Sequence, residues 1–318
     1  MRKMDVKRSI LVLLLVLAAS STSDAQLVEE VTPQEMINRA RARTAVYLET
    51  FKNLLSEEKK TFEIYEKGGK IKKRKVVDST FLVYQLTKEQ GKVAEFRNVT
   101  AVDGKKVANV DDRAKDFFEK VVASDNSQKE YERIRDESSR FDEDFAINGL
   151  TLFQAIALSD ELRGRFRFTM AGRESIGGKN VYVVLFEQIR ADPAITVNSA
   201  TASNNYDIEI EGASDVELNA RIRGKLWIDT DTFNVRRELR ERTIQPAGMA
   251  QPLVVAEDEL EYADSAFGIL TPQTLSHVQY RVRLKDGVAS KDTKILFEYG
   301  KFTQPDVEVK GEVKDKNQ

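Results

Sequence analysis

Residues 216–228 read VELNARIRGKLWI, and this stretch decides the class of fold. Apolar or small side chains stand at every second position from Val216 to Ile228, and the positions between them are mostly charged or polar. A period of two is that of a β-strand, whose successive side chains point to opposite faces of a sheet. At about 3.3 Å per residue the strand would be roughly 43 Å long. One apolar and one charged face predict an antiparallel sheet with a single buried side.

More strands of this kind are expected on both sides of it. They are predicted over residues 61–66, 76–87, 93–102, 165–171, 181–188, 234–244, 253–263, 274–284 and 290–300. The dipeptides Asp103-Gly104 and Gly177-Gly178, and Lys285-Asp286-Gly287, are typical of the tight turns that join neighbouring antiparallel strands. The sequence therefore predicts a meander of long strands.

A helix is expected before the first strand. Thr32 can cap it, Pro33 suits the first helical position, and Glu35 completes a capping box. Apolar residues then recur every three or four positions as far as Leu55, which predicts an amphipathic helix of about five or six turns. Residues 111–162 change to helical spacing and are expected to be a helical insertion between two runs of strands.

The expected fold class is therefore α+β, with a long curved antiparallel sheet, or half-barrel, wrapped on the N-terminal helix. The alternative is a closed up-and-down barrel, which the same strands could form. Residues 26–305 are expected to be a single half-barrel domain that includes the insertion, and residues 306–318 a charged flexible tail.

Residues 1–25 are typical of a secretory signal peptide. A basic start is followed by the apolar run Ile10–Ala19 and by Ser23-Asp24-Ala25, which ends in a small residue. The run is about half as long as the roughly 20 apolar residues of a membrane-spanning helix. Cleavage near Ala25 and a periplasmic or secreted location are expected, with no transmembrane segment in the mature chain; a retained anchor is the alternative.

The composition narrows the classes of function. The chain has no cysteine, which excludes disulfides and cysteine-ligated metal sites. Its 50 basic and 52 acidic residues give no electrostatic footprint for nucleic acid, so no nucleic-acid partner is expected. His277 is the only histidine, and an ordinary strand histidine is the favoured interpretation. With no nucleophile–base pair and no cofactor fingerprint, we expect no catalytic residues, metal or cofactor, and an enzyme is the least favoured class.

Two groups of charged residues have simple structural interpretations. Three glutamates and three arginines on neighbouring strands are expected to form ion pairs on the solvent side: Glu257, Glu259, Glu261, Arg236, Arg240 and Arg242. The basic run of Lys70, Lys72, Lys73, Arg74 and Lys75 is expected to be a solvated hairpin end. Contact with anionic lipid headgroups or another acidic surface is the functional alternative for this run.

Several stretches resemble parts of a known family. They are Glu95-Phe96-Arg97 leading to Val102-Asp103-Gly104-Lys105, Arg165-Phe166-Arg167-Phe168, and Gly224-Lys225-Leu226-Trp227-Ile228-Asp229 followed by Val235-Arg236-Arg237-Glu238. With the order of helix, hairpins and one-sided strands, the chain resembles the LolA/LolB-like lipoprotein-carrier superfamily, and within it uncharacterised exported envelope proteins of bacteria. The resemblance implies a concave sheet, partly closed by helices, that holds acyl chains in an apolar cavity. The insertion at 111–162 is larger than the lids of the compact carriers.

The leading hypothesis is an exported envelope protein that binds a lipid or other hydrophobic ligand in an apolar half-barrel cavity. The residues expected to line it are Leu82, Tyr84, Phe166, Phe168, Leu218, Ile222, Leu226, Ile228, Val278 and Tyr280. For each of them, packing against the N-terminal helix is the competing interpretation. The second hypothesis is an interaction or scaffold protein with a packed, ligand-free interior and an envelope protein as its partner.

Overall fold

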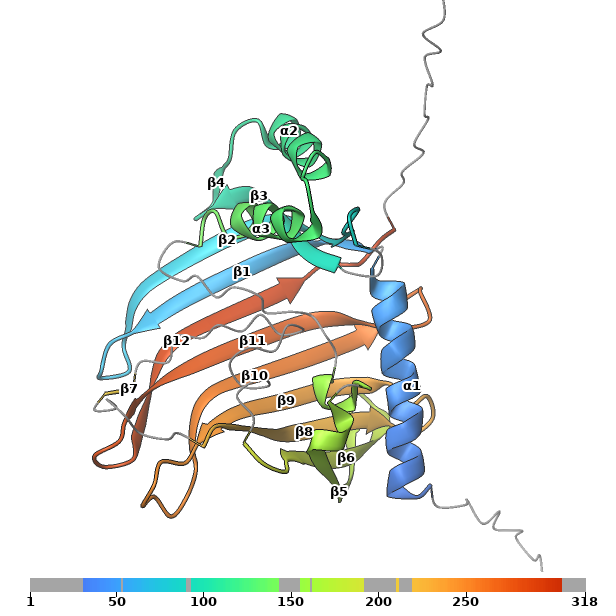
Figure 1. Cartoon of the computed structure of the whole chain (residues 1–318), viewed down its shortest axis with the longest axis vertical. Helices are drawn as coiled ribbons and strands as arrows, with labels where there is room; N and C mark the ends of the chain where they lie inside the picture. Colours follow the sequence, from blue (N-terminus) through green and yellow to red (C-terminus); the bar gives the residue numbers. More distant parts are fainter. Residues whose placement is uncertain are drawn as a thin grey trace, which may run out of the picture. The chain divides into compact units, whose positions relative to one another are not determined.

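A computed structural model of the chain describes residues 31–52, 54–89, 93–142, 155–160, 162–191, 210–211 and 219–304 (Figure 1). The chain divides after Thr32, and the unit that begins at Pro33 holds the helices and strands described below. The predicted signal peptide, residues 1–25, and the predicted tail, residues 306–318, lie outside the described residues. The single domain over 26–305 stays a prediction.

The helices and strands follow the predicted order closely. The helices are α1 (Pro33–Phe51), α2 (Val110–Val122) and α3 (Ser127–Ser138), with the short 3-10 turns η2 (Ile156–Leu158) and η3 (Arg163–Arg165). The strands are β1 (Leu55–Tyr65), β2 (Ile71–Gln85), β3 (Val93–Val102), β4 (Lys105–Lys106), β5 (Phe166–Ile176), β6 (Lys179–Gln188), β7 (Ile210–Glu211), β8 (Arg221–Asp229), β9 (Val235–Ile244), β10 (Leu253–Asp264), β11 (Leu270–Arg283) and β12 (Val288–Tyr299). The α+β class is thereby confirmed.

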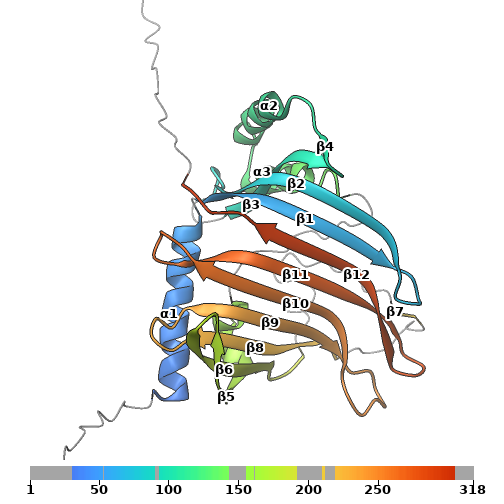
Figure 2. The ribbon, with the colours of Figure 1, turned by 180° about the vertical axis from the view of Figure 1, so that it is seen from behind.

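The strands form one sheet, which Figure 2 shows from behind. Its order is β4-β3-β2-β1-β12-β11-β10-β9-β8-β6-β5, and every pairing along this path is antiparallel. The short β7 pairs with β11 in parallel. Among the described strands β4 and β5 stand at the two ends of the path and do not pair with each other, so the sheet is open. The half-barrel is confirmed over the closed alternative.

Positive backbone φ angles mark the turns that the sequence predicted. Asp103 and Gly104 have φ values of 49° and 74°, and Gly177 and Gly178 have values of 55° and 78°. Two successive residues with positive φ are typical of a two-residue hairpin whose twist matches that of the flanking strands. Both predicted hairpins are therefore present, between β3 and β4 and between β5 and β6.

The strand that decided the fold is shorter than predicted. β8 begins at Arg221, and residues 216–218 lie outside the described residues. Asn219, just before the strand, has φ 41°, a left-handed conformation that does not continue an extended strand. The period of two holds within β8, but its second face is not fully exposed to solvent, because Trp227 is buried beside Val181 and Val183.

The largest core lies between α1 and one face of the sheet, which we call the inner face. α1 runs across the strand ends at one side of the sheet (Figures 1 and 2). Tyr47 and Phe51 of α1 stack on each other, with ring centroids 5.0 Å apart, and Phe51 also packs against Phe302 at 5.4 Å. Phe62 and Phe81 are fully buried in the same core. The apolar stripe of the helix therefore has the sheet as its cover.

The helical insertion packs on the opposite, outer face of β2 and β3. Its core consists of Leu86, Ala94, Phe96, Val121 and Ile134, with Leu82, Tyr84, Phe117, Phe118 and Tyr131 around them. Ser138 of α3 lies along β3: its hydroxyl donates to the carbonyl of Glu95 at 3.0 Å and accepts from the N–H of Arg97 at 3.1 Å. These bonds satisfy backbone groups that a bare sheet edge would leave open.

Candidate functional site

One row of paired residues runs across the inner face and defines the candidate site. Residues directly opposite each other in an antiparallel pair lie on the same face of the sheet. The register connects Phe168, Phe186, Gly224, Arg240, Asp258 and His277, in that order from β5 to β11. We call these six residues the inner row. Its first half is apolar and its second half is charged.

Five of the predicted lining residues lie together on the inner face. Phe166 and Phe168 come from β5, and Ile222, Leu226 and Ile228 come from β8. Their neighbours on β6 are Tyr182, Val184, Phe186 and Gln188, each paired with one of them. We call the inner faces of β5, β6 and β8 the apolar patch. Leu226 and Ile228 are fully buried, whereas Phe168 on the edge strand is only half-buried.

Gly224 leaves room on β8 for the ring of Phe186 to lie against the backbone. A Cβ atom at this position would lie 1.9 Å from the carbonyl oxygen of Leu239 and 2.6 Å from the ring of Phe186. The Phe186 ring therefore takes the place of a side chain at Gly224. It also meets Phe166 edge-on, with ring centroids 5.8 Å apart. An aromatic ring that covers a strand glycine in this way pins the register of β6 and β8.

The other predicted lining residues do not join this group. Leu82 and Tyr84 lie on the outer face, in the core of the helical insertion. Val278 pairs with Glu257 on the face opposite to His277, and Tyr280 follows it. Burial raises the pKa of Tyr280, and the outer-face carboxylates Glu257 and Glu241 raise it further. Leu218 lies outside the described residues. The ten residues are therefore not one lining, and ligand contact stays a prediction.

The charged half of the inner row, together with Glu238, forms a buried chain of hydrogen bonds and ion pairs. His277 Nδ1 lies 2.6 Å from Asp258 Oδ1, and Arg240 Nη1 lies 4.0 Å from Asp258 Oδ2. Arg240 Nε donates to Glu238 Oε1 at 3.1 Å. All four side chains are buried. Burial raises the pKa of Asp258, but His277 and the neighbouring Arg240 outweigh it, so the pKa of this carboxyl lies below its usual value.

These buried contacts correct the predicted ion pairs of β9 and β10. Arg240 faces inward, away from Glu257 and Glu259, and Glu259 pairs instead with Arg237. Arg236 is buried and pairs with Asp229 at 2.6 Å. The physical reason is that nearly every residue of β9 from 236 to 242 is charged, so both faces of this strand carry charge and the inward ones need buried partners.

A short helical turn covers Glu238, beside the charged half of the inner row. The backbone N–H of Ala155 donates to Glu238 Oε2 at 2.8 Å, and Glu238 pairs across the sheet with Leu226. Ala155, Ala157 and Leu158 are fully buried. Ala155 has φ 47°, an uncommon conformation for a residue with a side chain. The contact places η2 at the border between the apolar patch and the charged row.

A second buried ionic cluster holds the end of the helical insertion on the inner face. Lys60 Nζ lies 2.7 Å from Asp142 Oδ1, just after α3, and Arg97 Nε donates to Glu58 at 2.8 Å. The Arg97 guanidinium also lies 5.1 Å from the ring of Phe81. Burial lowers the pKa of Arg97, but Glu58 and Glu95 raise it well above its ordinary value. This cluster therefore fixes the insertion to the main core.

Sequence reasoning missed the buried Glu238 and Asp258, the partner of His277, and placed Arg240 on the solvent side. The available signal was the lack of any apolar alternation in β9, which cannot bury one face without burying charge. The buried His277 ring offers no exposed edge to a substrate in this structure. Among the described residues no group of three or more His, Asp or Glu side chains is placed to hold a metal ion. Within the same residues, no helix is both long and apolar enough to cross a bilayer.

Comparisons with known proteins give similarities of structure. No protein-family model matches the chain, and no curated protein matches it in sequence. Similar solved structures include a DUF1329 family protein from Desulfovibrio piger (11% identity, TM-score 0.32, covering 87% of this chain and 94% of that one). They also include a LolA superfamily protein from Nitrosomonas europaea (11% identity, TM-score 0.32, covering 87% of this chain and 95% of that one). A third is the lipoprotein LppX from Mycobacterium tuberculosis (10% identity, TM-score 0.25, covering 86% of this chain and 98% of that one).

The similarity extends over most of each chain but is weak. At these identities and TM-scores it identifies neither a ligand nor an activity for this chain.

Proposed function

We propose that the chain is an exported envelope protein that binds a lipid or other hydrophobic ligand on the inner face of its half-barrel. The observation that carries the proposal is the join within the inner row, where the apolar Phe168 and Phe186 lead directly into the charged Arg240 and Asp258. A surface that is apolar on one side and charged on the other suits a molecule with an acyl or ring body and a polar end.

The apolar patch would supply most of the affinity. Covering about 300 Å² of apolar surface is worth about 7.5 kcal/mol at 25 cal/mol per Å², before the costs of association. The half-buried Phe168 and Met170 lie on the inner side of β5, at the open end of the sheet, and support access from that edge.

A polar group lies within the apolar patch. Gln188 is buried at the end of β6, and its side-chain carbonyl accepts from the N–H of Ile222 at 2.9 Å. Its amide nitrogen has no hydrogen-bond partner among the described residues. A buried N–H without a partner costs free energy. Gln188 is therefore suited to donate to a carbonyl or hydroxyl of the ligand.

Export is supported by residues 1–25 of the sequence, which have the order of a secretory signal. The intact mass of protein recovered from the cell envelope tests this part directly. We expect a chain that begins at Gln26. A recovered mass that still includes residues 1–25 contradicts cleavage.

The second candidate is an envelope interaction protein with a packed interior. The observation in its favour is that the protein's own residues fully bury Leu226 and Ile228. A partner protein would then bind elsewhere on the chain, and the inner face would serve only to hold the sheet together.

Native mass spectrometry of protein purified from its own envelope separates the two candidates. We expect one apolar molecule per chain, released by organic extraction and identified by its mass. Protein that is empty, and that also fails to bind a fluorescent fatty acid after purification, contradicts ligand binding and favours the packed interior.

A further inference from the structure

The hairpin between β1 and β2 ends in a dense group of exposed positive charges. Every residue from 66 to 74 is exposed. Five of these nine residues are basic, namely Lys67, Lys70, Lys72, Lys73 and Arg74, and only Glu66 is acidic. The full chain carries a net charge of −2, so the hairpin end has the opposite sign to the molecule as a whole.

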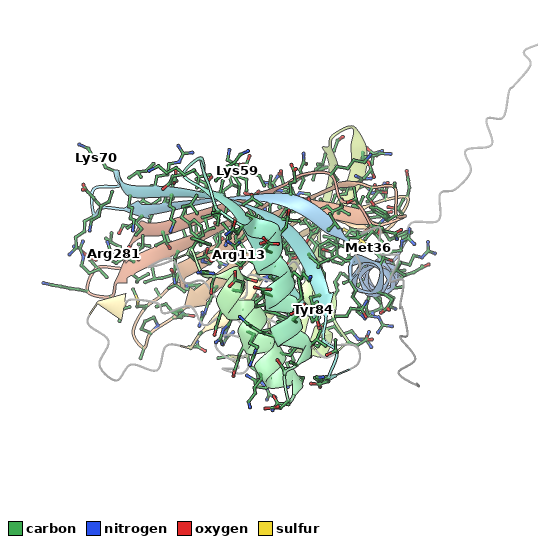
Figure 3. The ribbon with its side chains drawn as sticks, turned by 90° about the horizontal axis from the view of Figure 1, so that it is seen from above. Met36, Lys59, Lys70, Tyr84, Arg113 and Arg281 are labelled. Atoms are coloured by element: carbon green, nitrogen blue, oxygen red, sulfur yellow. The ribbon has the colours of Figure 1, made fainter. Side chains whose placement is uncertain are left out.

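A second hairpin lies beside it. Ile64 of β1 pairs with Thr293 of β12, so residues 288–292 run alongside the end of the β1–β2 hairpin. Both hairpins lie at the end of the sheet that is away from α1 (Figures 1 and 2). Figure 3 shows Lys70 and Arg281 at this end, with Met36 of α1 at the other. Lys285 and Lys291 of the second hairpin are also exposed.

Exposed aliphatic side chains accompany the charges. Ile71 is 51% exposed and Val288 is 46% exposed, which makes them two of the few large apolar residues on the described surface. We call this end of the sheet, residues 66–74 with 285–291, the basic end. Arg74 pairs with Glu63 and Lys73 pairs with Ile64, so these two basic residues lie on opposite faces of β2, and the register then shifts before Ile71 pairs with Tyr65. The basic end therefore presents charge on both sides of a protruding tip.

We propose that the basic end docks the protein on an anionic lipid bilayer. Clusters of four to eight basic residues bind anionic membranes, with roughly a fivefold gain in partitioning for each basic residue near the surface. Ile71 and Val288 add apolar contacts with the boundary between headgroups and acyl chains. Paired strands hold the tip in shape, so docking does not require folding of a disordered segment.

The shape of the tip favours a membrane over an acidic protein. A peptide or protein partner is usually held in a groove or on a broad patch, with aromatic anchors at its centre. The basic end is formed by the tips of two hairpins, and its exposed apolar residues are aliphatic. Lysine-rich tips with flanking aliphatic residues suit a planar layer of phosphate headgroups, which needs no fixed hydrogen-bond geometry.

Vesicle co-sedimentation of the purified chain tests this proposal. The vesicles are phosphatidylcholine with or without phosphatidylglycerol, at low and at high salt. We expect binding only to vesicles that contain phosphatidylglycerol, and loss of binding at high salt, because screening weakens contacts between exposed charges. The triple variant Lys70→Gln, Lys72→Gln and Arg74→Gln should bind on the order of 100-fold more weakly.

A matched variant controls for net charge. Lys115, Lys120 and Lys179 are also exposed but lie on α2 and at the start of β6. Their replacement by Gln removes the same three charges and should leave vesicle binding within about twofold of the unmodified chain, since these residues lie away from the basic end. Circular dichroism melts of both variants check that the fold is kept.

Contact between Ile71 and the bilayer can be measured separately, by tryptophan fluorescence. Trp227 is the only tryptophan and is buried, so a Trp at position 71 reports on the tip. The fluorescence of the Ile71→Trp chain should shift to the blue with phosphatidylglycerol vesicles only.

Three results would overturn the proposal: no binding to anionic vesicles at low salt, equal losses in the two triple variants, or salt-sensitive binding to polyglutamate without binding to vesicles. The last result would point to an acidic protein partner. None of these measurements depends on whether the inner face holds a ligand.

Discussion

His277 on β11 and Asp258 on β10 face each other across the sheet, with Nδ1 and Oδ1 2.6 Å apart. The pair lies at the centre of the inner face, where a one-layer sheet would ordinarily place apolar residues. Arg240 continues the chain to β9. Three neighbouring strands are therefore tied by side chains as well as by backbone hydrogen bonds, and the tie depends on the charge of Asp258.

Replacement of Asp258 by Asn should destabilise the fold at neutral pH. The substitution removes the buried negative charge that lies between His277 and Arg240. The expected loss in the free energy of unfolding is about 3 kcal/mol, as for other broken buried pairs. Urea denaturation at pH 7 measures it. Glu259→Gln, one residue along on the outer face, is the control and should cost less than about 1 kcal/mol.

The same pair gives a pH dependence. The pKa of Asp258 in the folded protein is below its unfolded value of about 3.9, so its charge stabilises the fold above that value. This contribution is lost as the pH falls through the folded-state pKa. The stability difference between the unmodified chain and Asp258→Asn should therefore shrink in acid. A difference that stays constant from pH 7 to acid contradicts the assignment.

Gly224 should tolerate no side chain. A Cβ there would lie 1.9 Å from the Leu239 carbonyl oxygen, a backbone atom that cannot rotate away. Gly224→Ala should therefore cost about 3 kcal/mol or more, or prevent folding. Gly164→Ala is the control, because nothing lies within 4 Å of its Cβ, and it should change stability by less than about 0.5 kcal/mol. Thermal melts of both variants provide the comparison.

The strands could be predicted because their period of two and their turn dipeptides are local signals. The faces were harder to assign. Residues 81–84 of β2 read FLVY, so both faces are apolar, and only the helical insertion decides that Leu82 and Tyr84 face outward. The sequence alone does not show which of the two apolar faces of β2 points inward.

The charged row depends on register. Arg240 meets Asp258 because the β9–β10 pairing shifts at an irregularity between Val254 and Ala256. Shifting the pairing by one residue moves a side chain to the other face. No sequence signal in residues 245–255 fixes that shift, so the sequence alone predicts acidic partners for Arg240 on the wrong side of β10.

Glu130 should act as the anchor of the helical insertion. It is fully buried on α3 and accepts from the Tyr84 hydroxyl, from the backbone N–H and hydroxyl of Thr87, and from the N–H of Lys88. Burial raises the pKa of Glu130, but the hydrogen bonds from Thr87 and Lys88 have the larger effect, so the pKa of this carboxyl lies below its usual value. Glu130→Gln should therefore cost about 1–3 kcal/mol. The same substitution should speed up amide hydrogen exchange in α3. Glu119→Gln, at an exposed position, should leave both the stability and the exchange rate unchanged.

Tyr84 reports on the same anchor at high pH. Burial, with the hydrogen bond to Glu130, raises the pKa of Tyr84 to about 12. A raised folded-state value stabilises the fold below the unfolded pKa of about 10, and this contribution is lost as the pH rises through about 12. The stability difference between the unmodified chain and Tyr84→Phe should hold to about pH 10 and then fall. No change over this range contradicts the anchor.

Ligand binding should depend on Phe168 and not on its outer-face neighbour Leu185. Phe168 lies half-buried at the edge of the apolar patch, whereas Leu185 on the adjacent strand is 38% exposed on the other face. Phe168→Ala removes roughly 100 Å² of contact, worth about 2.5 kcal/mol, and should raise the Kd for a fluorescent fatty acid by well over tenfold. Leu185→Ala should leave it unchanged. Equal effects of the two changes would place the ligand away from the inner face, because only Phe168 belongs to the apolar patch.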